Sequence, residues 1–389
     1  MQYNFNELID RRHTNSVKHD FAKERGMPDD VLPLWVADMD FRVPYEVEEA
    51  LVNTARHGVF GYSEVKDEYF NAVHNWHANR FGLRLQPDWL VKTPGVVFAI
   101  STAIRAFTEP GDRVLTQPPV YPPFRDTIRA NDRRVVTNPL VLEDGAYRID
   151  FEDFERKIQE NDVKLFLLCS PHNPTGRVWR VEELQRMGEI CMRYHCKILS
   201  DEIHCDFAHK PHQHHTLLTA VPECTDSTVL CTAPSKTFNL AGLQTSNLFI
   251  PNPDMKKAFR AELRRVGYGE LNAMGLAACQ AAYKHGGDWL DQLMDYLAGN
   301  FAYLREFLAN HIPQIQLIQP EATYLAWLDC RGLGLSVEEL NHLMTHKAKL
   351  WLNDGSIFGV EGMGFQRMNL ACPKSVLEQA LHQLHQAVR

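Results

Sequence analysis

Short apolar runs alternate with amphipathic stretches through the first two thirds of the chain. The runs have the length of buried strands, and the stretches between them carry apolar residues at helical spacing. This β-α-β alternation predicts an α/β fold in which a mostly parallel central sheet is flanked by helices. We expect strands at 89–92, 112–116, 134–140, 164–169 and 197–200, and helices at 68–81, 99–107, 151–159 and 181–194.

A different pattern begins after residue 254. Long amphipathic helices are expected at 255–266, 271–285 and 288–310, with a glycine break at 286–287. Short strands and helices then follow in the mixed order of an α+β unit. We therefore predict three parts: an N-terminal arm (1–45) that joins the small domain, a large domain (46–287) and a small C-terminal domain (288–389).

Length and composition agree with two globular domains. At 389 residues the chain exceeds one ordinary core, and 44% apolar with 23% charged residues is typical of a soluble protein. The net charge of −8 argues against a nucleic-acid-binding surface, and no run approaches the roughly 20 apolar residues of a membrane span. The start lacks the apolar core of a signal peptide, so we expect a cytoplasmic protein.

The cysteines and histidines give little reason to expect a metal. Nine cysteines is an odd number without the spacing of a disulfide framework or a zinc site, so reduced thiols are expected. The run HKPHQHH at 209–215 has no cysteine or carboxylate at ligand spacing within it. A solvated loop is the favoured interpretation of this run, and no metal is predicted.

Lys236 stands in an unusual place for a lysine. The apolar strand at 229–230 runs into small and hydroxyl residues, and Asn239, Ala241 and Gly242 follow the lysine. No acid lies beside Lys236 to pair with it on a surface, and burial of a free ammonium is costly. One solution is a lysine that is condensed with a carbonyl compound as a Schiff base.

Two further polar stretches follow apolar runs in the same way. Asn173, in PHNPTG, follows the run at 165–169, and Asp201, in SDEIH, follows the run at 198–199. Polar groups at the carboxyl ends of parallel strands meet at the edge where open α/β sheets bind ligands. An Asn, an Asp and a Lys in this order resemble the pyridoxal-phosphate site of the aspartate-aminotransferase fold.

A helix start and a rigid loop fit the same ligand. The backbone N–H groups of Val96 and Val97 open an expected helix after Gly95 and form a natural phosphate seat, although an ordinary βα junction has the same appearance. Four prolines around Tyr121 fix the direction of its side chain. Such a ring suits stacking on a flat cofactor, with a core tyrosine as the alternative.

Charged residues inside apolar segments are candidate substrate contacts. Arg367 lies within an apolar strand, where its planar guanidinium fits a carboxylate by two parallel hydrogen bonds; the alternative is a structural salt bridge. Trp35, Asp38 and Asp40 stand between apolar residues of LPLWVADMDF. This segment either lines a site, with Trp35 and Asp38 as substrate contacts, or caps the helix that begins near Pro44.

Segments along essentially the whole chain resemble the MalY/PatB family of pyridoxal-phosphate-dependent cystathionine β-lyases, which are cysteine-S-conjugate β-lyases. The resemblance implies a homodimer of the fold type I architecture with pyridoxal 5′-phosphate as its cofactor. The segments that carry it are WVADMDF (35–41), GVFGYS (58–63), CSPHNPTG (169–176), SDEIH (200–204), SKTFNLAGL (235–243), TYLAWLD (323–329) and RMNLACP (367–373).

The resemblance assigns the groups around the cofactor ring. Lys236 holds the cofactor covalently and, once released, acts as the base at the substrate Cα. Asp201 pairs with the pyridine nitrogen and keeps it protonated. Asn173 donates to the phenolic oxygen, His204 is a second candidate donor to the same oxygen, and Tyr121 stacks on the ring.

It also assigns the two anion sites. Val96, Val97 and the hydroxyl of Ser235 hold the phosphate, and Tyr62 reaches the phosphate in the partner subunit's site. Arg367 anchors the α-carboxylate of the substrate.

Two positions depart from the wider aminotransferase pattern. His204 stands where many relatives have a tyrosine, and Gln244 stands where many have a phosphate-binding arginine. Both departures favour a lyase over a transaminase, and Gln244 leaves the phosphate with one cation fewer.

The expected function is therefore a carbon–sulfur β-lyase that converts cystathionine or a related cysteine thioether into a thiol, pyruvate and ammonia. An aminotransferase of the same fold is the main alternative, because both reactions begin with removal of the Cα proton. A regulatory binding protein is the third, since some members of the family restrain a transcription activator, but the sequence shows no surface patch for this role.

Overall fold

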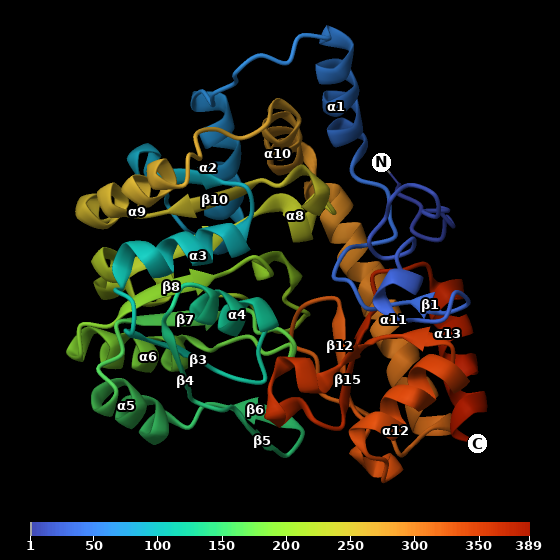
Figure 1. The fold of residues 1–389 in the computed structure, drawn as a ribbon. Helices are drawn as coiled ribbons and strands as arrows, with labels where there is room; N and C mark the ends of the chain where they lie inside the picture. The colour runs from blue at the N-terminus through green and yellow to red at the C-terminus, as the bar shows by residue number, and fades with distance from the viewer. Residues whose placement is uncertain (1) are drawn as a thin grey trace.

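A seven-stranded sheet forms the centre of the larger unit in the computed structural model, which describes residues 2–389 (Figure 1). The strand order is β2-β10-β9-β8-β7-β3-β4, and five of these strands run parallel. The mostly parallel sheet predicted from the sequence is thereby confirmed. The strand bounds are β2 (Leu90–Thr93), β3 (Arg113–Thr116), β4 (Arg134–Thr137), β7 (Leu165–Cys169), β8 (Lys197–Asp201), β9 (Thr228–Thr232) and β10 (Ser246–Phe249).

Helices cover both faces of this sheet, which explains why the central strands are continuous apolar runs. On β7, Leu165 and Leu167 pack against α3, α4 and α9, whereas Phe166 and Leu168 pack against α5 and α6. The alternation follows from the two-residue period of a strand. The helices of the larger unit are α1 (Tyr45–His57), α2 (Asp67–Phe81), α3 (Val96–Phe107), α4 (Pro122–Ala130), α5 (Phe151–Glu160), α6 (Val181–Arg193), α7 (Leu217–Ala220), α8 (Pro234–Thr237), α9 (Pro253–Arg265) and α10 (Ala273–His285).

The helices α4, α7 and α8 of the larger unit were not predicted, and neither were two features of its strands. The strand β10 follows Lys236 and runs antiparallel to β9 and β2, on a stretch with polar Ser246 and Asn247 that lacks the apolar pattern. A short hairpin, β5 (Val141–Glu143) and β6 (Ala146–Arg148), turns at Asp144 and Gly145. Both differences arise where strand pairing, and not side-chain patterning, decides the structure.

The smaller unit packs helices against one face of an antiparallel sheet. Its strand order is β11 (Gln316–Leu317), β12 (Leu325–Asp329), β15 (Phe365–Asn369), β14 (Asn353–Asp354). Met368 of β15 packs on the helices of this unit, whereas Phe365 packs with residues of the larger unit. Arg367 and Asn369 share the face of Phe365 by the two-residue period and so point toward the larger unit. The helices are α11 (Gly287–His311), α12 (Val337–His342) and α13 (Lys374–Val388).

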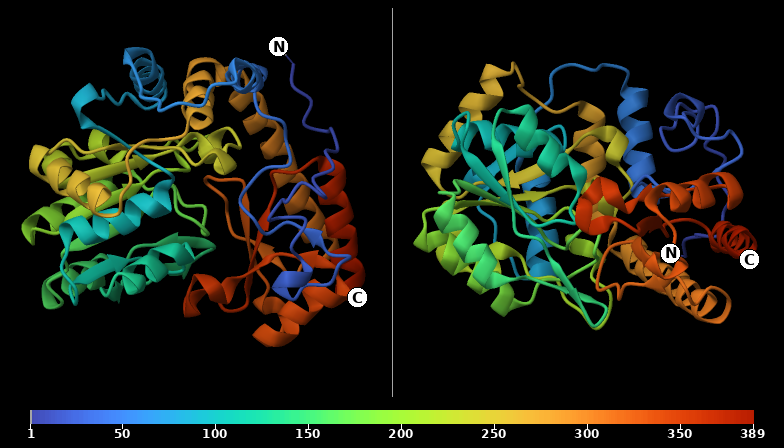
Figure 2. Two further views of the ribbon diagram at one scale, coloured as in Figure 1. Left: turned by 45° about the horizontal axis from the view of Figure 1, so that its top comes forward. Right: turned by 60° about the horizontal axis from the view of Figure 1, so that its bottom comes forward.

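The N-terminal segment lies against the smaller unit, as all views show (Figure 2). Its short strand β1 (Leu32–Pro33) pairs in parallel with β13 (Leu350–Trp351). The break predicted at the paired glycines separates α10 from α11, and a Cβ on Gly286 would lie 2.3 Å from the ring of Phe238. The domain boundaries at residues 45 and 287 stay a prediction.

Within residues 2–389, no helix is both long enough and apolar enough to cross a membrane. All nine cysteines are buried free thiols.

A buried ion network connects the larger unit with the segment that leads into β12. Arg177 binds Glu321 and Glu183, each at 2.9 Å, and all three side chains are at most 15% exposed. The same carboxylate of Glu321 accepts the backbone N–H of Val178 at 2.8 Å. The backbone N–H of Ala322 then donates to Gly176 at 2.9 Å, so the two units are joined next to the loop that carries Asn173.

We expect Glu321→Ala to lower the free energy of unfolding by about 3 kcal/mol, because it leaves a buried guanidinium short of one charge partner. Urea unfolding measures this difference. Glu143→Ala, which removes the exposed partner of Arg148, serves as the control and should leave the unfolding midpoint unchanged. Equal midpoints for both variants would contradict the proposed role of the network.

Candidate active site

One cavity of about 360 Å³ lies beyond the carboxyl ends of β7, β8 and β9. Its lining includes Asn173, Asp201 and Lys236, the three strand-end residues that the sequence predicted to meet. Arg367 reaches the same cavity from β15 of the smaller unit. The cavity therefore lies where the two units and the N-terminal segment come together.

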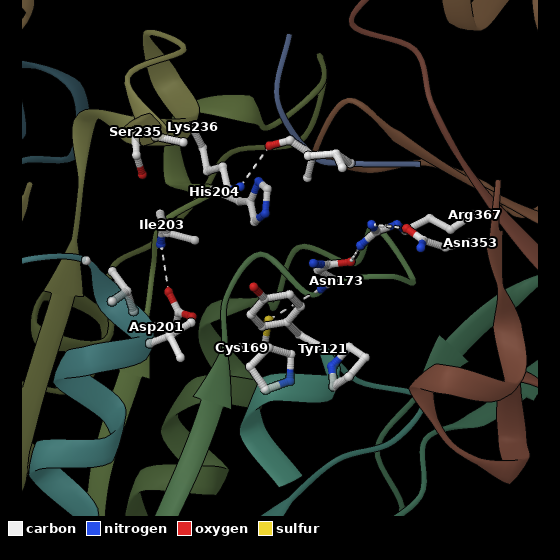
Figure 3. A pocket seen from close by; sticks show the side chains of 18 of the residues that line it. Tyr121, Cys169, Asn173, Asp201, Ile203, His204, Ser235, Lys236, Asn353 and Arg367 are labelled. Carbon is white, nitrogen blue, oxygen red and sulfur yellow. Dashed lines mark hydrogen bonds between the residues drawn. The ribbon is translucent and has the colours of Figure 1, made fainter. Parts of the chain in front are cut away.

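Lys236 lies on the short helix α8, directly after β9. Asp206 anchors this helix by accepting hydrogen bonds from the hydroxyl of Thr237 at 2.7 Å and from the indole N–H of Trp76 at 3.0 Å. The Lys236 amine donates to the backbone carbonyl of Ala37 at 2.8 Å (Figure 3). Burial, and then the nearby charge of Arg367, lower the pKa of Lys236 to about 8, so the amine is partly neutral near physiological pH.

Asp201 ends β8 with a buried carboxylate that faces the cavity. It accepts the backbone N–H of Ile203 at 3.1 Å. Burial raises the pKa of Asp201 to about 7, against the opposing effects of that hydrogen bond and of Lys236. The carboxylate is thus placed to gain from a cationic partner inside the cavity.

Arg367 is buried among neutral acceptors. Its guanidinium donates to the side-chain oxygens of Asn173 at 2.9 Å and Asn353 at 2.5 Å, and to the carbonyl of Trp35 at 3.1 Å. Its Nε has no partner in the described part of the chain, and burial lowers the pKa of Arg367 to about 10. These contacts differ from the structural salt bridge weighed as the alternative and leave the cation able to bind an anionic ligand.

Asn173 is fixed from two sides, so one end of its amide remains for a ligand. Its oxygen accepts from Arg367, and its backbone carbonyl accepts the N–H of Tyr121 at 3.1 Å. The amide nitrogen is the end left to donate, as the predicted contact with a phenolic oxygen requires. In Figure 3, Tyr121 and Asn173 lie between Asp201 and Arg367.

The predicted phosphate seat lines the same cavity. Gly95 has φ of 113°, and α3 begins at Val96, so the first N–H groups of a 12-residue helix are available there. A Cβ at Gly95 would meet no atom within 4 Å, so the positive φ and not crowding requires glycine. The cavity lining also includes Val97, Ser235 and Gln244, and the last of these adopts a left-handed backbone conformation with φ of 48°.

His204 is buried beside Lys236, and its Nδ1 has no partner in the described structure. Its ring packs edge-on against Tyr324, with 6.0 Å between centroids. Burial, aided by the charges of Lys236 and Arg367, lowers the pKa of His204 to about 3, so the ring is neutral. A neutral imidazole with an unsatisfied nitrogen can bond to a cofactor oxygen as the resemblance implies.

Three predicted residues occupy different surroundings. Trp35 lines the cavity and stacks on Trp351, with 4.4 Å between ring centroids. Asp38 lies outside the lining and forms an ion pair with Arg11 at 2.7 Å. Tyr62 is fully exposed and is not part of this cavity. Substrate contact by Trp35 and Asp38, and cofactor contact by Tyr62, stay predictions.

Sequence reasoning missed several residues that shape the site. Asn239 ties the lysine segment to the N-terminal segment by bonding both the N–H and the carbonyl of Met39, each at 2.9 Å. Tyr324 donates to the carbonyl of Ala37 at 2.9 Å, and Asn353 binds Arg367. Asn239 and Tyr324 lie inside the segments SKTFNLAGL and TYLAWLD that carry the family resemblance, whereas no sequence signal marks Asn353.

Comparisons with known proteins agree with this geometry. Residues 29–384 match the family described as aminotransferase class I and II. Cystathionine β-lyase PatB of Bacillus subtilis (strain 168) is 43% identical to this chain, over 99% of the chain and 100% of that protein. Protein MalY of Escherichia coli (strain K12) is 33% identical, over 100% of this chain and 99% of that protein. The crystal structure of a pyridoxal-phosphate-bound candidate aminotransferase from Clostridium difficile 630 superimposes with a TM-score of 0.97 at 40% identity and covers 100% of both chains.

We expect the contribution of Asp201 to the stability of the ligand-free protein to be lost as the pH rises from about 4 to about 7, in the opposite direction to the contribution of a buried neutral histidine such as His204. The folded state keeps Asp201 protonated up to about pH 7, whereas the unfolded chain releases that proton near pH 4, so ionisation destabilises the folded state across this window. Asp201→Asn removes the titrating group and should raise the free energy of unfolding at pH 8 by up to about 4 kcal/mol.

Urea unfolding of the ligand-free protein at pH 5 and pH 8 checks this expectation. Asp126→Asn, at an exposed position of α4, is the control and should not change the pH dependence. If the free energy of unfolding of Asp201→Asn depended on pH as that of the unchanged protein does, the raised pKa assigned to Asp201 would be wrong.

Proposed function

We propose that this chain, which belongs to the class I and II aminotransferase family and to its MalY/PatB group of cystathionine β-lyases, is a pyridoxal-phosphate-dependent carbon–sulfur β-lyase. Its substrate is cystathionine or a related cysteine thioether, which it converts into a thiol, pyruvate and ammonia. The observation that carries the proposal is one cavity in which a partly buried lysine with a lowered pKa, a buried aspartate with a raised pKa and a buried arginine converge.

The residues present fit pyridoxal phosphate. Asp201 offers a buried carboxylate to a protonated ring nitrogen, and the Nδ1 of His204 lacks a partner that a ring oxygen can provide. Gly95 and the start of α3 offer backbone N–H groups to a phosphate, together with the nearby hydroxyl of Ser235. Tyr121 borders the cavity from the start of α4 and can stack on the ring.

The cofactor, when bound, supplies an aldehyde that takes the substrate amine and a ring that accepts the electrons of the broken Cα–H bond. The residues of this chain supply the rest. Arg367 binds the α-carboxylate and so orients the substrate, and the Nζ of Lys236 takes the Cα proton. The bond from Cβ to sulfur then breaks, the thiolate leaves with its electron pair, and Lys236 or a water returns a proton to that sulfur. The released enamine hydrolyses to pyruvate and ammonia.

An aminotransferase of the same fold is the second candidate. The high structural similarity to the Clostridium difficile protein favours it, because that protein is described as a candidate aminotransferase. The same lysine, aspartate and arginine serve both reactions until the Cα proton has been removed. In a lyase, the bond from Cβ to sulfur breaks after the Cα proton has been removed. In an aminotransferase, a proton is returned instead and the sulfur stays bound to the substrate.

We also propose a homodimer in the cytoplasm. The loop at 58–63 exposes large apolar side chains, with 72% of Val59 and 64% of Phe60 accessible, and a second copy is the natural partner for such a surface. Tyr62 on this loop is free to reach the other copy's cofactor site, which supports its predicted phosphate contact. The nine buried free thiols support a reducing compartment.

The cofactor-loaded enzyme with cystathionine and no keto acid tests the proposed function. We expect sustained release of pyruvate and homocysteine while the visible band of the bound cofactor persists, and no release from Lys236→Ala. Bleaching of the band after one turnover, with rescue by an added keto acid, would identify an aminotransferase. Persistent turnover by Lys236→Ala would contradict the role of Lys236 as the base that takes the Cα proton.

Mixing two inactive variants tests the dimer and Tyr62 together. Each hybrid of a Tyr62→Ala subunit with a Lys236→Ala subunit contains one intact site if Tyr62 acts across the interface. Random mixing should therefore restore about one quarter of the wild-type activity, because half of the dimers are hybrids with one working site. No restoration, although each variant alone is inactive, would place Tyr62 in its own subunit's site or outside the site altogether.

A further inference from the structure

Five consecutive backbone carbonyls, from Trp35 to Met39, each accept a hydrogen bond from a side chain. We call this segment the carbonyl strap. It is neither helix nor strand, and Trp35, Val36 and Ala37 line the cavity. The direction of each carbonyl therefore depends on the side chains that bind it.

Asn369 holds the strap on both sides of Ala37. Its amide nitrogen donates to the carbonyls of Val36 and Asp38, each at 2.6 Å, while its oxygen accepts the backbone N–H of Ala371 at 2.8 Å. These partners fix which end of the amide carries the nitrogen. Asn369 is 1% exposed, lies two residues beyond Arg367 and shares its face of β15.

The carbonyl of Ala37, which lies between those of Val36 and Asp38, points toward Lys236. The oxygen of Ala37 accepts the Lys236 amine at 2.8 Å and the hydroxyl of Tyr324 at 2.9 Å. Other groups that act on the lysine are Arg367 from β15, Asp201 from β8 and Asp38 from the strap, with His204 beside it. Among the described residues, the Ala37 oxygen is the one hydrogen-bond acceptor found for this amine.

We propose that Asn369 is a positioning residue, which aims the Ala37 carbonyl at Lys236 and so gives the amine a resting acceptor whenever it has no covalent partner. In the β-lyase function proposed above, on which this inference rests, the lysine is in that state when it acts on the substrate. Held there, the amine stays inside the cavity with its direction fixed, and a freely rotating amine would spend less time in the reactive geometry.

The bond has a definite effect on the protonation of the lysine. An ammonium donates more strongly to a carbonyl than a neutral amine does, so the Ala37 oxygen favours the charged form and offsets part of the effect of burial and of Arg367. Turning that carbonyl away should lower the pKa of Lys236 further. Removing the competing hydroxyl of Tyr324 should act in the opposite direction, because the carbonyl then serves the lysine alone.

The test uses the full-length protein after removal of the cofactor, in which Lys236 can be titrated without turnover. The rate at which trinitrobenzenesulfonate modifies Lys236 is followed against pH by mass spectrometry of the peptide that contains it. The modification rate rises as Lys236 loses its proton, so the midpoint of this curve reports the pKa of Lys236. We expect Asn369→Ser to lower that midpoint by about one pH unit relative to the unchanged protein. In the reloaded enzyme, kcat for cystathionine should fall about tenfold while KM changes less than about threefold, because Asn173 and Asn353 still hold Arg367.

Asn300→Ser is the matched control. Asn300 is also buried and donates to two backbone carbonyls, those of Leu370 at 2.9 Å and Cys372 at 3.0 Å, but it is not part of the cavity lining. This variant should lose stability without moving the midpoint of Lys236. An unmoved midpoint in Asn369→Ser, or an equal shift in Asn300→Ser, overturns the proposal.

If Asn369→Ser does not fold, Tyr324→Phe decides the question. An upward shift of the Lys236 midpoint supports the proposal that Lys236 and Tyr324 share the Ala37 carbonyl. The absence of a shift, or a downward shift, overturns it. Failure of the proposed function is seen separately, as absence of thiol release from the unchanged, cofactor-loaded enzyme, since the titration of Lys236 does not require turnover.

Discussion

The burial of two cations in one cavity is the constraint on which the rest of this structure depends. Arg367 is buried and Lys236 is partly buried, and the charge of Arg367 lowers the pKa of Lys236. Their nearest partners are neutral oxygens, namely amide side chains and backbone carbonyls. Such an arrangement is stable only with many well-placed acceptors, and it leaves positive potential for the phosphate and carboxylate groups of ligands.

The N-terminal segment supplies half of these acceptors, the carbonyls of Trp35 and Ala37, which explains why residues far from the sheet in sequence shape the site. Its strap is held by Asn239 from the lysine segment and by Asn369 from the smaller unit. Behind it, Lys18 binds Asp40 at 2.6 Å and Arg11 binds both Asp38 and Asp40. Asp38 and Asp40, the two acids within this apolar sequence, thus anchor the strap by ion pairs outside the cavity. Residues 35–37 of the strap line the cavity itself.

The sequence was most informative where side-chain chemistry and strand position coincide. Asn173, Asp201 and Lys236 were predicted to meet because each follows an apolar strand, and the cavity contains all three. The backbone contacts of the strap were beyond such reasoning, because every residue has a carbonyl and only the fold decides its direction. The strand β10 was missed for a similar reason, since its polar residues give no apolar run and its pairing with β9 and β2 forms only in the folded chain. Asn353 and Asn369 are ordinary amides in the sequence. Asn353 acquires its role by contacting Arg367 on the neighbouring strand, and Asn369 acquires its role by contacting Val36, which lies 333 residues away.

The central claim is that Lys236 is the reactive amine at the centre of the site. Borohydride reduction of the cofactor-loaded protein, followed by mass spectrometry of its peptides, tests this claim most directly, because reduction makes the link between lysine and cofactor permanent. We predict the mass of the phosphopyridoxyl group on Lys236 and on no other lysine. Attachment to a different lysine, or the absence of any covalent adduct in a protein that binds the cofactor, would contradict it.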